Sequence, residues 1–183
     1  MAPRHQPALD RDRVVAAAFE QLEEDGLEAL SMRRLAARLG VQAPALYWHF
    51  GDKAELLGLM SARIYAMALA ETQGAIDWRG WLVAYGEALR RSFAAHRDGA
   101  LLCARARPPQ AIEPEVQAAR LAAPLVALGL DQARALSAQA AVIAFALGWA
   151  MYAANGPMRD HLAQMLDFDA TFSQGLAALV RGL

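Results

Sequence analysis

Apolar residues recur every three to four positions along most of the chain, and this spacing predicts amphipathic helices. Capping residues, glycines and prolines interrupt the pattern and mark the expected helix ends. The predicted helices span residues 11–25, 32–39, 43–49, 52–70, 77–96, 99–107, 114–129, 131–154, 157–166 and 170–181, with an interruption at Pro124 in the helix 114–129. No alternating strand pattern occurs, so the expected fold class is all-α.

Local signals support the first four helices. Asp10 and Ser31 stand where N-caps are expected, and Pro44 lies in a first turn, where its missing N–H costs nothing. Asp52 and Glu55 have the spacing of a capping box. We therefore expect three short N-terminal helices followed by a long fourth one.

Composition indicates a folded globular protein, with 56% hydrophobic and 20% charged residues among 183. The net charge of −1 gives no hint of a polyanionic partner. Its distribution does, because residues 31–53 carry Arg33, Arg34, Arg38 and Lys53 against Asp52 alone. Residues 20–28, by contrast, carry only acidic charges.

Cys103 is the only cysteine, so no internal disulfide can form, and a lone thiol suits a reducing cytoplasm. Two interpretations stay open. Arg105 and Arg107 would lower the thiol pKa in a redox sensor, whereas a small apolar residue on a helix is the favoured alternative. The first residues lack the apolar core of a signal peptide.

Residues 135–154 carry no charged side chain, and a segment of this length is about long enough to cross a bilayer as a helix. Nine of these residues are alanine, and small residues allow close helix packing. We expect this segment to be a helix buried on most sides of a soluble bundle, with no membrane partner.

The short helix capped by Ser31, the turn Leu39-Gly40-Val41 and the next short helix predict a helix-turn-helix. In this motif the second helix enters the DNA major groove. Four consecutive rings follow at residues 47–50, and one helix cannot bury them all on one face. We expect Leu46 and Phe50 to face the core and the intervening rings to lie on or near the DNA side. The alternative is a solvated three-helix cap whose arginines keep it soluble.

The segment VVAAAFEQLEEDGLEALSMRRLAARLGVQAPALYWHFGDKAELL, residues 14–57, resembles the DNA-binding domain of TetR-family transcriptional regulators. Trp48 between Tyr47 and His49 is the variant found in the tetracycline-repressor branch, and His96-Arg-Asp-Gly-Ala resembles its ligand domain. The resemblance implies a homodimeric repressor of a palindromic double-stranded DNA operator, released by a small-molecule effector. It places a helix-turn-helix domain at residues 1–53 and an effector-binding and dimerisation domain at 54–183.

By the same resemblance, base and phosphate contacts fall to residues of the second and third helices and the start of the fourth. They are Ser31, Arg33, Gln42, Ala43, Pro44, Ala45, Tyr47, Trp48, His49 and Lys53. Ala43 and Ala45 depart from the tetracycline repressors, which carry polar side chains there. Base readout should therefore depend on Arg33 and Gln42, and the operator should differ.

The effector site also departs from that branch, because Cys103 and Ala106 replace its magnesium-binding histidine and a hydroxyl. The resemblance thus implies no magnesium site and no cofactor, and an apolar or aromatic effector whose polar end is fixed by Tyr85 or Arg105. The expected lining is Met60, Ile64, Met67, Trp81, Tyr85, Leu89, Phe93, Cys103, Arg105, Trp149 and Tyr152. Taken singly, each of these residues also suits an ordinary core.

An apolar stripe on the last helix needs a partner, and small residues on the helix 131–154 permit close approach. The expected dimer interface comprises Ala138, Ala141, Phe145, Gly148, Phe172, Leu176 and Leu179.

Enzymatic activity is not expected, because no carboxylate pair, Ser-His-Asp arrangement or metal-ligand spacing occurs, and His96 and His161 are isolated. A helical protein that binds DNA or carries a ligand without an effector switch remains the alternative function. In the favoured hypothesis, the helix 52–70 links the reading helices to the effector site.

Overall fold

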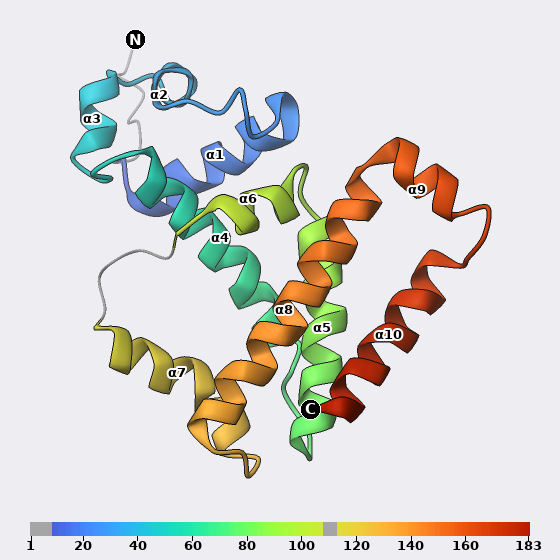
Figure 1. Ribbon diagram of the computed structural model, residues 1–183. Helices are drawn as coiled ribbons and strands as arrows, with labels where there is room; N and C mark the ends of the chain where they lie inside the picture. The colour runs from blue at the N-terminus through green and yellow to red at the C-terminus, as the bar shows by residue number, and fades with distance from the viewer. Residues whose placement is uncertain (1–8, 108–112) are drawn as a thin grey trace.

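The computed structural model describes residues 9–107 and 113–183, and within them the chain is helical with no strand (Figure 1). The helices are α1 (Arg11–Asp25), α2 (Met32–Leu39), α3 (Ala43–Tyr47), α4 (Lys53–Ala70), α5 (Trp78–Ala94), α6 (Gly99–Arg105), α7 (Pro114–Val126), α8 (Gln132–Ala154), α9 (Gly156–Leu162) and α10 (Phe168–Gly182). The expected all-α class is confirmed.

Helices α1 to α3 form a small unit at one end of the molecule, here called the head (Figure 1). Asp10 Oδ1 accepts a hydrogen bond from Arg13 N at 2.7 Å, and Ser31 Oγ accepts one from Arg34 N at 3.3 Å, so both predicted N-caps form. Gly40 ends α2 in the left-handed conformation with φ 69°, which glycine adopts without strain. These caps fix the short turn between α2 and α3.

Several predicted helix ends were wrong, with the largest difference at α9, which ends at Leu162 rather than at residue 166. Helix α3 ends at Tyr47 rather than at residue 49, and His49 and Phe50 instead donate turn hydrogen bonds to the Leu46 carbonyl. Pro124 does not interrupt α7, which continues to Val126. Because Pro124 lies in the last turn and Arg120 is exposed, the carbonyl that loses its partner can be hydrated.

The remaining helices, α4 to α10, form the body. Helix α5 is its centre and packs against α4, α6, α8 and α10, whereas α4 also contacts α1 of the head. A Cβ on Gly86 would lie 2.7 Å from both methyl groups of Leu176, so glycine lets α5 and α10 approach closely. Helix α4 is thus the long element that joins head and body.

Helix α8 is long and apolar enough to cross a membrane, with a mean hydropathy of 1.5, and 33% of its most apolar window is buried. Burial on most sides was therefore an overestimate. One face, with Ala135, Val142 and Ala146, packs inside the body, while Ala144 and Gly148 are exposed on another. The packing of α8 against α5, α7 and α10 of the same chain is that of a core helix in a bundle.

Candidate nucleic-acid interface and effector site

The large side chains of α3 and of the turn after it divide between core and surface as predicted. Leu46 and Phe50 are buried, whereas Tyr47 is 51% and Trp48 90% exposed. His49 is half-buried between them. An indole and a phenol that point into solvent lose contact energy unless a partner covers them, and each has a hydrogen that a phosphate oxygen can accept. The exposed side of α3 therefore presents groups that can contact a phosphate backbone.

The three arginines of α2 differ in how they are paired. Arg34 lies 2.7 Å from an Asp25 carboxylate oxygen, and Arg38 contacts Glu20 at 3.5 Å and Glu24 at 2.8 Å. The acidic residues of α1 thus neutralise two of the three basic charges. Within the described residues, Arg33 makes no ion pair or side-chain hydrogen bond. Its exposed guanidinium can bind a base edge without first breaking a salt bridge.

The start of α3 presents a second unengaged polar group. Gln42 is its N-cap residue, yet the side chain makes no capping hydrogen bond and is exposed. Pro44 beside it is exposed, while Ala43 and Ala45 are half-buried. The small side chains of Ala43, Pro44 and Ala45 leave room for a close approach of base edges. The Gln42 amide offers hydrogen-bonding groups to those edges.

Lys53 begins α4 among acidic neighbours. Asp52 Oδ1 accepts from Glu55 N at 2.8 Å, which confirms the cap. The Glu55 carboxylate accepts from Gly51 N at 2.7 Å, rather than from the N–H of Asp52 as in a standard capping box, and it pairs with Arg11. Lys53 is partly exposed and, within the described residues, its side chain makes no ion pair or hydrogen bond, so its ammonium group is available to a phosphate.

The turn between α5 and α6 is hydrogen-bonded to the end of α1. The sequence did not indicate this contact. His96 Nδ1 lies 2.9 Å from Glu23 Oε1, and the His96 ring lies 4.5 Å from that of Phe19. Arg97 Nη1 donates to the carbonyl oxygens of Glu23 at 3.3 Å and Glu24 at 2.6 Å. The expectation that His96 is isolated was therefore wrong.

Asp98 completes this turn. Its Oδ2 accepts from Leu27 N at 2.9 Å, and it is the only non-glycine among the described residues with a positive φ, 55°. Arg105, the last residue of α6, forms an ion pair with Glu28. Arg105 thus faces the head rather than an effector pocket, contrary to the prediction. Together these contacts connect the body to α1 independently of α4.

The other predicted pocket residues fall into two groups. Most are buried side chains of the α4, α5 and α6 packing: Met60, Ile64, Trp81, Tyr85, Leu89, Phe93 and Cys103. Met67 is 48% and Tyr152 50% exposed, and Trp149 lies half-buried between α8 and α10. The structure therefore brings together the buried α4, α5 and α6 residues of the predicted site, but not Met67 of α4 or the two residues of α8.

Three weakly acidic groups lie in this α4–α6 region. Burial raises the pKa of Cys103 to about 11, and a hydrogen bond with Ser61 opposes the rise only in part. Burial likewise raises the pKa of Tyr65 to about 12 and that of Tyr85 further still. The thiol is therefore protonated at neutral pH, and the proposed lowering of its pKa by nearby arginines is not found.

Aromatic side chains from α8 and α10 form one cluster. Ring centroids lie 5.2 Å apart for Phe145 and Phe172, 5.9 Å for Trp149 and Phe172, and 5.0 Å for Trp149 and Phe168. Phe172 is wholly buried in this cluster, and Leu176 is wholly buried against α5. Neither has exposed surface to offer a second chain, so the expected interface differs at these two positions.

The remaining predicted interface residues lie differently. Ala138 is buried, Ala141, Phe145 and Leu179 are half-buried, and Gly148 is exposed. A Cβ on Gly148 would meet nothing within 4 Å. The exposed face of α8 is therefore smooth and open around this glycine.

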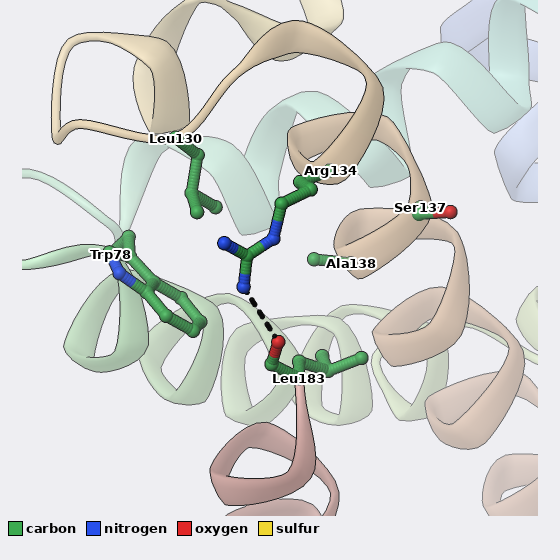
Figure 2. A pocket seen from close by; sticks show the side chains of 6 residues that line it. All are labelled: Trp78, Leu130, Arg134, Ser137, Ala138 and Leu183. Carbon is green, nitrogen blue, oxygen red and sulfur yellow. Dashed lines mark hydrogen bonds between the residues drawn. The ribbon is translucent and has the colours of Figure 1, made fainter.

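A small pocket of about 170 Å³ lies where the start of α8 meets the end of α10 and the start of α5 (Figure 2). Arg134 reaches across it, and its Nη2 donates to the Leu183 carbonyl oxygen at 3.0 Å. Trp78 and Leu130 form the apolar sides. Because the guanidinium occupies this space, the contact ties α10 to α8 rather than leaving a ligand site.

Comparison with known proteins places these features in context. Residues 14–60 match the family model described as bacterial regulatory proteins, tetR family. The class A tetracycline repressor protein from transposon 1721 of Escherichia coli is 32% identical over 96% of this chain and 90% of its own length. The family match includes most of α1, all of α2 and α3, and the beginning of α4.

Two solved structures share the fold over nearly the full chain. A TetR variant from Acinetobacter baumannii AYE, in complex with minocycline, has a TM-score of 0.78 and 33% identity, covering 96% of each chain. The Streptomyces coelicolor TetR family protein ActR, in complex with (S)-DNPA, has a TM-score of 0.77 and 28% identity, covering 100% of this chain and 98% of its own. Each of these two structures contains one small molecule, and the two molecules are different.

Proposed function

We propose, from the premise that this chain belongs to the tetR family of bacterial regulatory proteins, that it is a ligand-responsive transcriptional repressor acting in the cytoplasm. A homodimer would bind a palindromic DNA operator and leave it when a small molecule binds. The observation that carries this proposal is the exposure of Arg33 on α2 and of Gln42, Tyr47 and Trp48 on or next to α3 of the helix-turn-helix. We assign no catalytic role to the chain.

The roles at the DNA surface follow from which groups are unengaged. Arg33 and Gln42 are proposed to contact base edges, with Pro44, Ala43 and Ala45 offering apolar contact to thymine methyl groups. Ser31, Tyr47, Trp48, His49 and Lys53 are proposed to donate to phosphates, which set the position of the head without sequence preference. Ser31 can do so because its oxygen accepts the capping bond while its O–H remains available.

Dimerisation is proposed to use the exposed face of α8 around Ala141 and Gly148, with Phe145 and Leu179 at its edge. Small side chains there allow two helices to approach closely. A dimer is required because two α3 helices must enter successive major grooves about 34–36 Å apart. Residues 1–53 would then act as the DNA-binding domain and residues 54–183 as the effector and dimer domain.

The effector is proposed to lie between α4 and α5, near Met60, Ile64 and Met67 on α4 and Tyr85 and Leu89 on α5. It would tilt α4 and change the separation of the two heads. A ligand shifts this equilibrium only by its differential affinity for the two states, and about 1–3 kcal/mol gives partial release. The apolar side chains, together with Trp81, Phe93 and Cys103, favour an apolar or aromatic molecule whose polar end meets the Tyr85 hydroxyl.

Selection of bound duplexes from random DNA by the full-length protein tests this proposal. We expect enrichment of a palindrome with half-sites about one helical turn apart, and release of the protein by a subset of lipophilic aromatic compounds in a gel-shift assay. Enrichment of a palindrome without release by any compound would support the alternative function, DNA binding without a switch. A protein that is strictly monomeric and enriches no sequence would contradict the proposal altogether.

A further inference from the structure

A second cleft has a volume of about 780 Å³. It is formed by the end of α5, the α5–α6 turn, the end of α8, α9 and the start of α10. Its volume falls in the range of about 300–1,000 Å³ that small-molecule sites occupy. Of the residues predicted to line an effector pocket, it contains only Phe93 and Trp149.

The wall of this cleft includes three aromatic residues from three helices. Phe93 of α5 is buried, whereas Trp149 of α8 and Phe168 of α10 are half-buried, with their ring centroids 5.0 Å apart. Partly exposed rings of this kind offer their faces and edges to another flat apolar group. The cleft therefore suits an aromatic or polycyclic ring system.

Two of the three arginines around the cleft have guanidinium groups that are already engaged. Arg90 pairs with Asp169 at 2.5 Å and with Glu87 at 3.4 Å, and Arg97 donates to the α1 carbonyls. In the part of the chain that the structure describes, Arg159 of α9 makes no ion pair or side-chain hydrogen bond. Its guanidinium is therefore the unengaged one among the arginines of this cleft, and guanidinium groups bind carboxylates through two parallel hydrogen bonds.

Asn155 adds a donor beside this cation. Its Oδ1 accepts from Met158 N at 3.3 Å, which leaves the amide NH₂ group for another acceptor. Aromatic faces, one spare guanidinium and one spare amide thus line the same space. We propose that this cleft binds an aromatic carboxylate, with its ring against Trp149 and Phe168 and its carboxylate on Arg159.

The position of the cleft gives the bound acid a regulatory route, and this part rests on the proposed function. His96, Arg97 and Asp98 line the cleft and also hold the end of α1. A ligand that moves this turn changes the contacts that orient the head, without passing through α4. The cleft is therefore a second effector site with its own connection to the DNA-binding surface.

Binding of naphthoate to the full-length protein without DNA tests the site, with tryptophan fluorescence and titration calorimetry as readouts. We expect saturable binding that Arg159→Gln weakens at least about tenfold, because a charge-assisted pair contributes about 1.5–3 kcal/mol. The matched control is Arg120→Gln, since Arg120 is an exposed arginine of α7 outside the cleft with no recorded side-chain partner. Neutral naphthamide should bind at least about tenfold more weakly than naphthoate.

Equal affinity of wild type and Arg159→Gln, or of naphthoate and naphthamide, would overturn the proposal. Absence of binding together with concentration-dependent protection of residues 156–162 from hydrogen exchange would overturn it in favour of a second copy seated in the cleft. Because the titration contains no DNA, its failure leaves the repressor function standing. Failure of the DNA selection, conversely, leaves the acid-binding site standing.

Discussion

Two groups of aromatic residues illustrate how the same chemistry serves two ends of this molecule. The group at residues 47–50 is consecutive in sequence, and Trp48 in it is 90% exposed. The group formed by Phe145, Trp149, Phe168 and Phe172 is spread over α8 and α10, and Phe172 in it is fully buried. Consecutive rings cannot all face the core, so some of them are exposed. Rings spaced along two packed helices can cover one another and form a core.

The composition of the two groups fits this difference. Tyr47, Trp48 and His49 each carry a polar hydrogen that can be donated to water in the free protein and to a phosphate in a DNA complex. Phenylalanines predominate in the second group and are covered by one another. The comparison predicts that truncating a buried ring of the second group affects folding, whereas truncating the exposed Tyr47 or Trp48 of the first affects DNA binding alone.

The largest effect should come from Phe172→Ala. Removing a fully buried ring from the cluster should lower the free energy of unfolding by about 3–5 kcal/mol, through lost transfer energy and a cavity. Urea denaturation followed by circular dichroism measures it. Trp48→Ala is the matched control and should stay within about 0.5 kcal/mol of wild type. Comparable losses in both variants would contradict the division.

Tyr47→Ala should weaken DNA binding by about tenfold or more with unchanged unfolding free energy, because a hydrogen bond to a charged phosphate is lost. The loss should be the same on the selected operator and on an unrelated duplex. Tyr47→Phe, which keeps the ring and removes only the hydroxyl, separates stacking from hydrogen bonding. A loss confined to the operator would instead make Tyr47 a base-reading residue.

A smaller effect is expected for Arg97→Ala, which removes the donors to the Glu23 and Glu24 carbonyls at the end of α1. We expect a loss of about 1 kcal/mol in unfolding free energy. Hydrogen exchange should also become faster at the end of α1, and Arg91→Ala, at an exposed arginine of α5 that pairs with Glu71, serves as control. Unchanged exchange at α1 would mean that α4 alone holds the head.

The smallest effect concerns Cys103, whose thiol is buried and has its pKa raised to about 11 from an ordinary value of 9.0. Because the folded state retains this proton longer than the unfolded chain, its contribution to stability is complete below pH 9 and is lost as pH rises towards 11. Cys103→Ala should flatten the fall in melting temperature over this interval. Tyr65, with a pKa raised to about 12, still contributes at higher pH. If the melting temperature of Cys103→Ala falls as steeply with pH as that of wild type, ionisation of Cys103 does not cause the fall.

Much of the fold was predictable because its signals are local. The N-caps at Asp10, Ser31 and Asp52 set helix starts to the residue, and the rings of α3 followed from helical periodicity. The same reasoning failed for Phe172 and Leu176, since periodicity identifies an apolar face but not the chain that covers it. In this chain α5 and α8 cover that face.

The contacts that sequence reasoning missed are long-range. Glu23 and His96 are 73 positions apart, and nothing near either residue indicates the other. Likewise, the basic segment of α2 loses Arg34 and Arg38 to acids on α1, so the sequence overstated its free charge. Only the tertiary structure identifies Arg33 as the guanidinium of α2 that remains unpaired.

The account depends most on Arg33 and its neighbours contacting DNA bases, and a ratio of affinities tests this most directly. The ratio compares the selected operator with an unrelated duplex at fixed salt concentration, for wild type and Arg33→Ala. We predict that the variant loses about 1–3 kcal/mol on the operator and little on the unrelated duplex, so the ratio falls by about tenfold or more. An unchanged ratio would contradict the placement of this surface in the major groove.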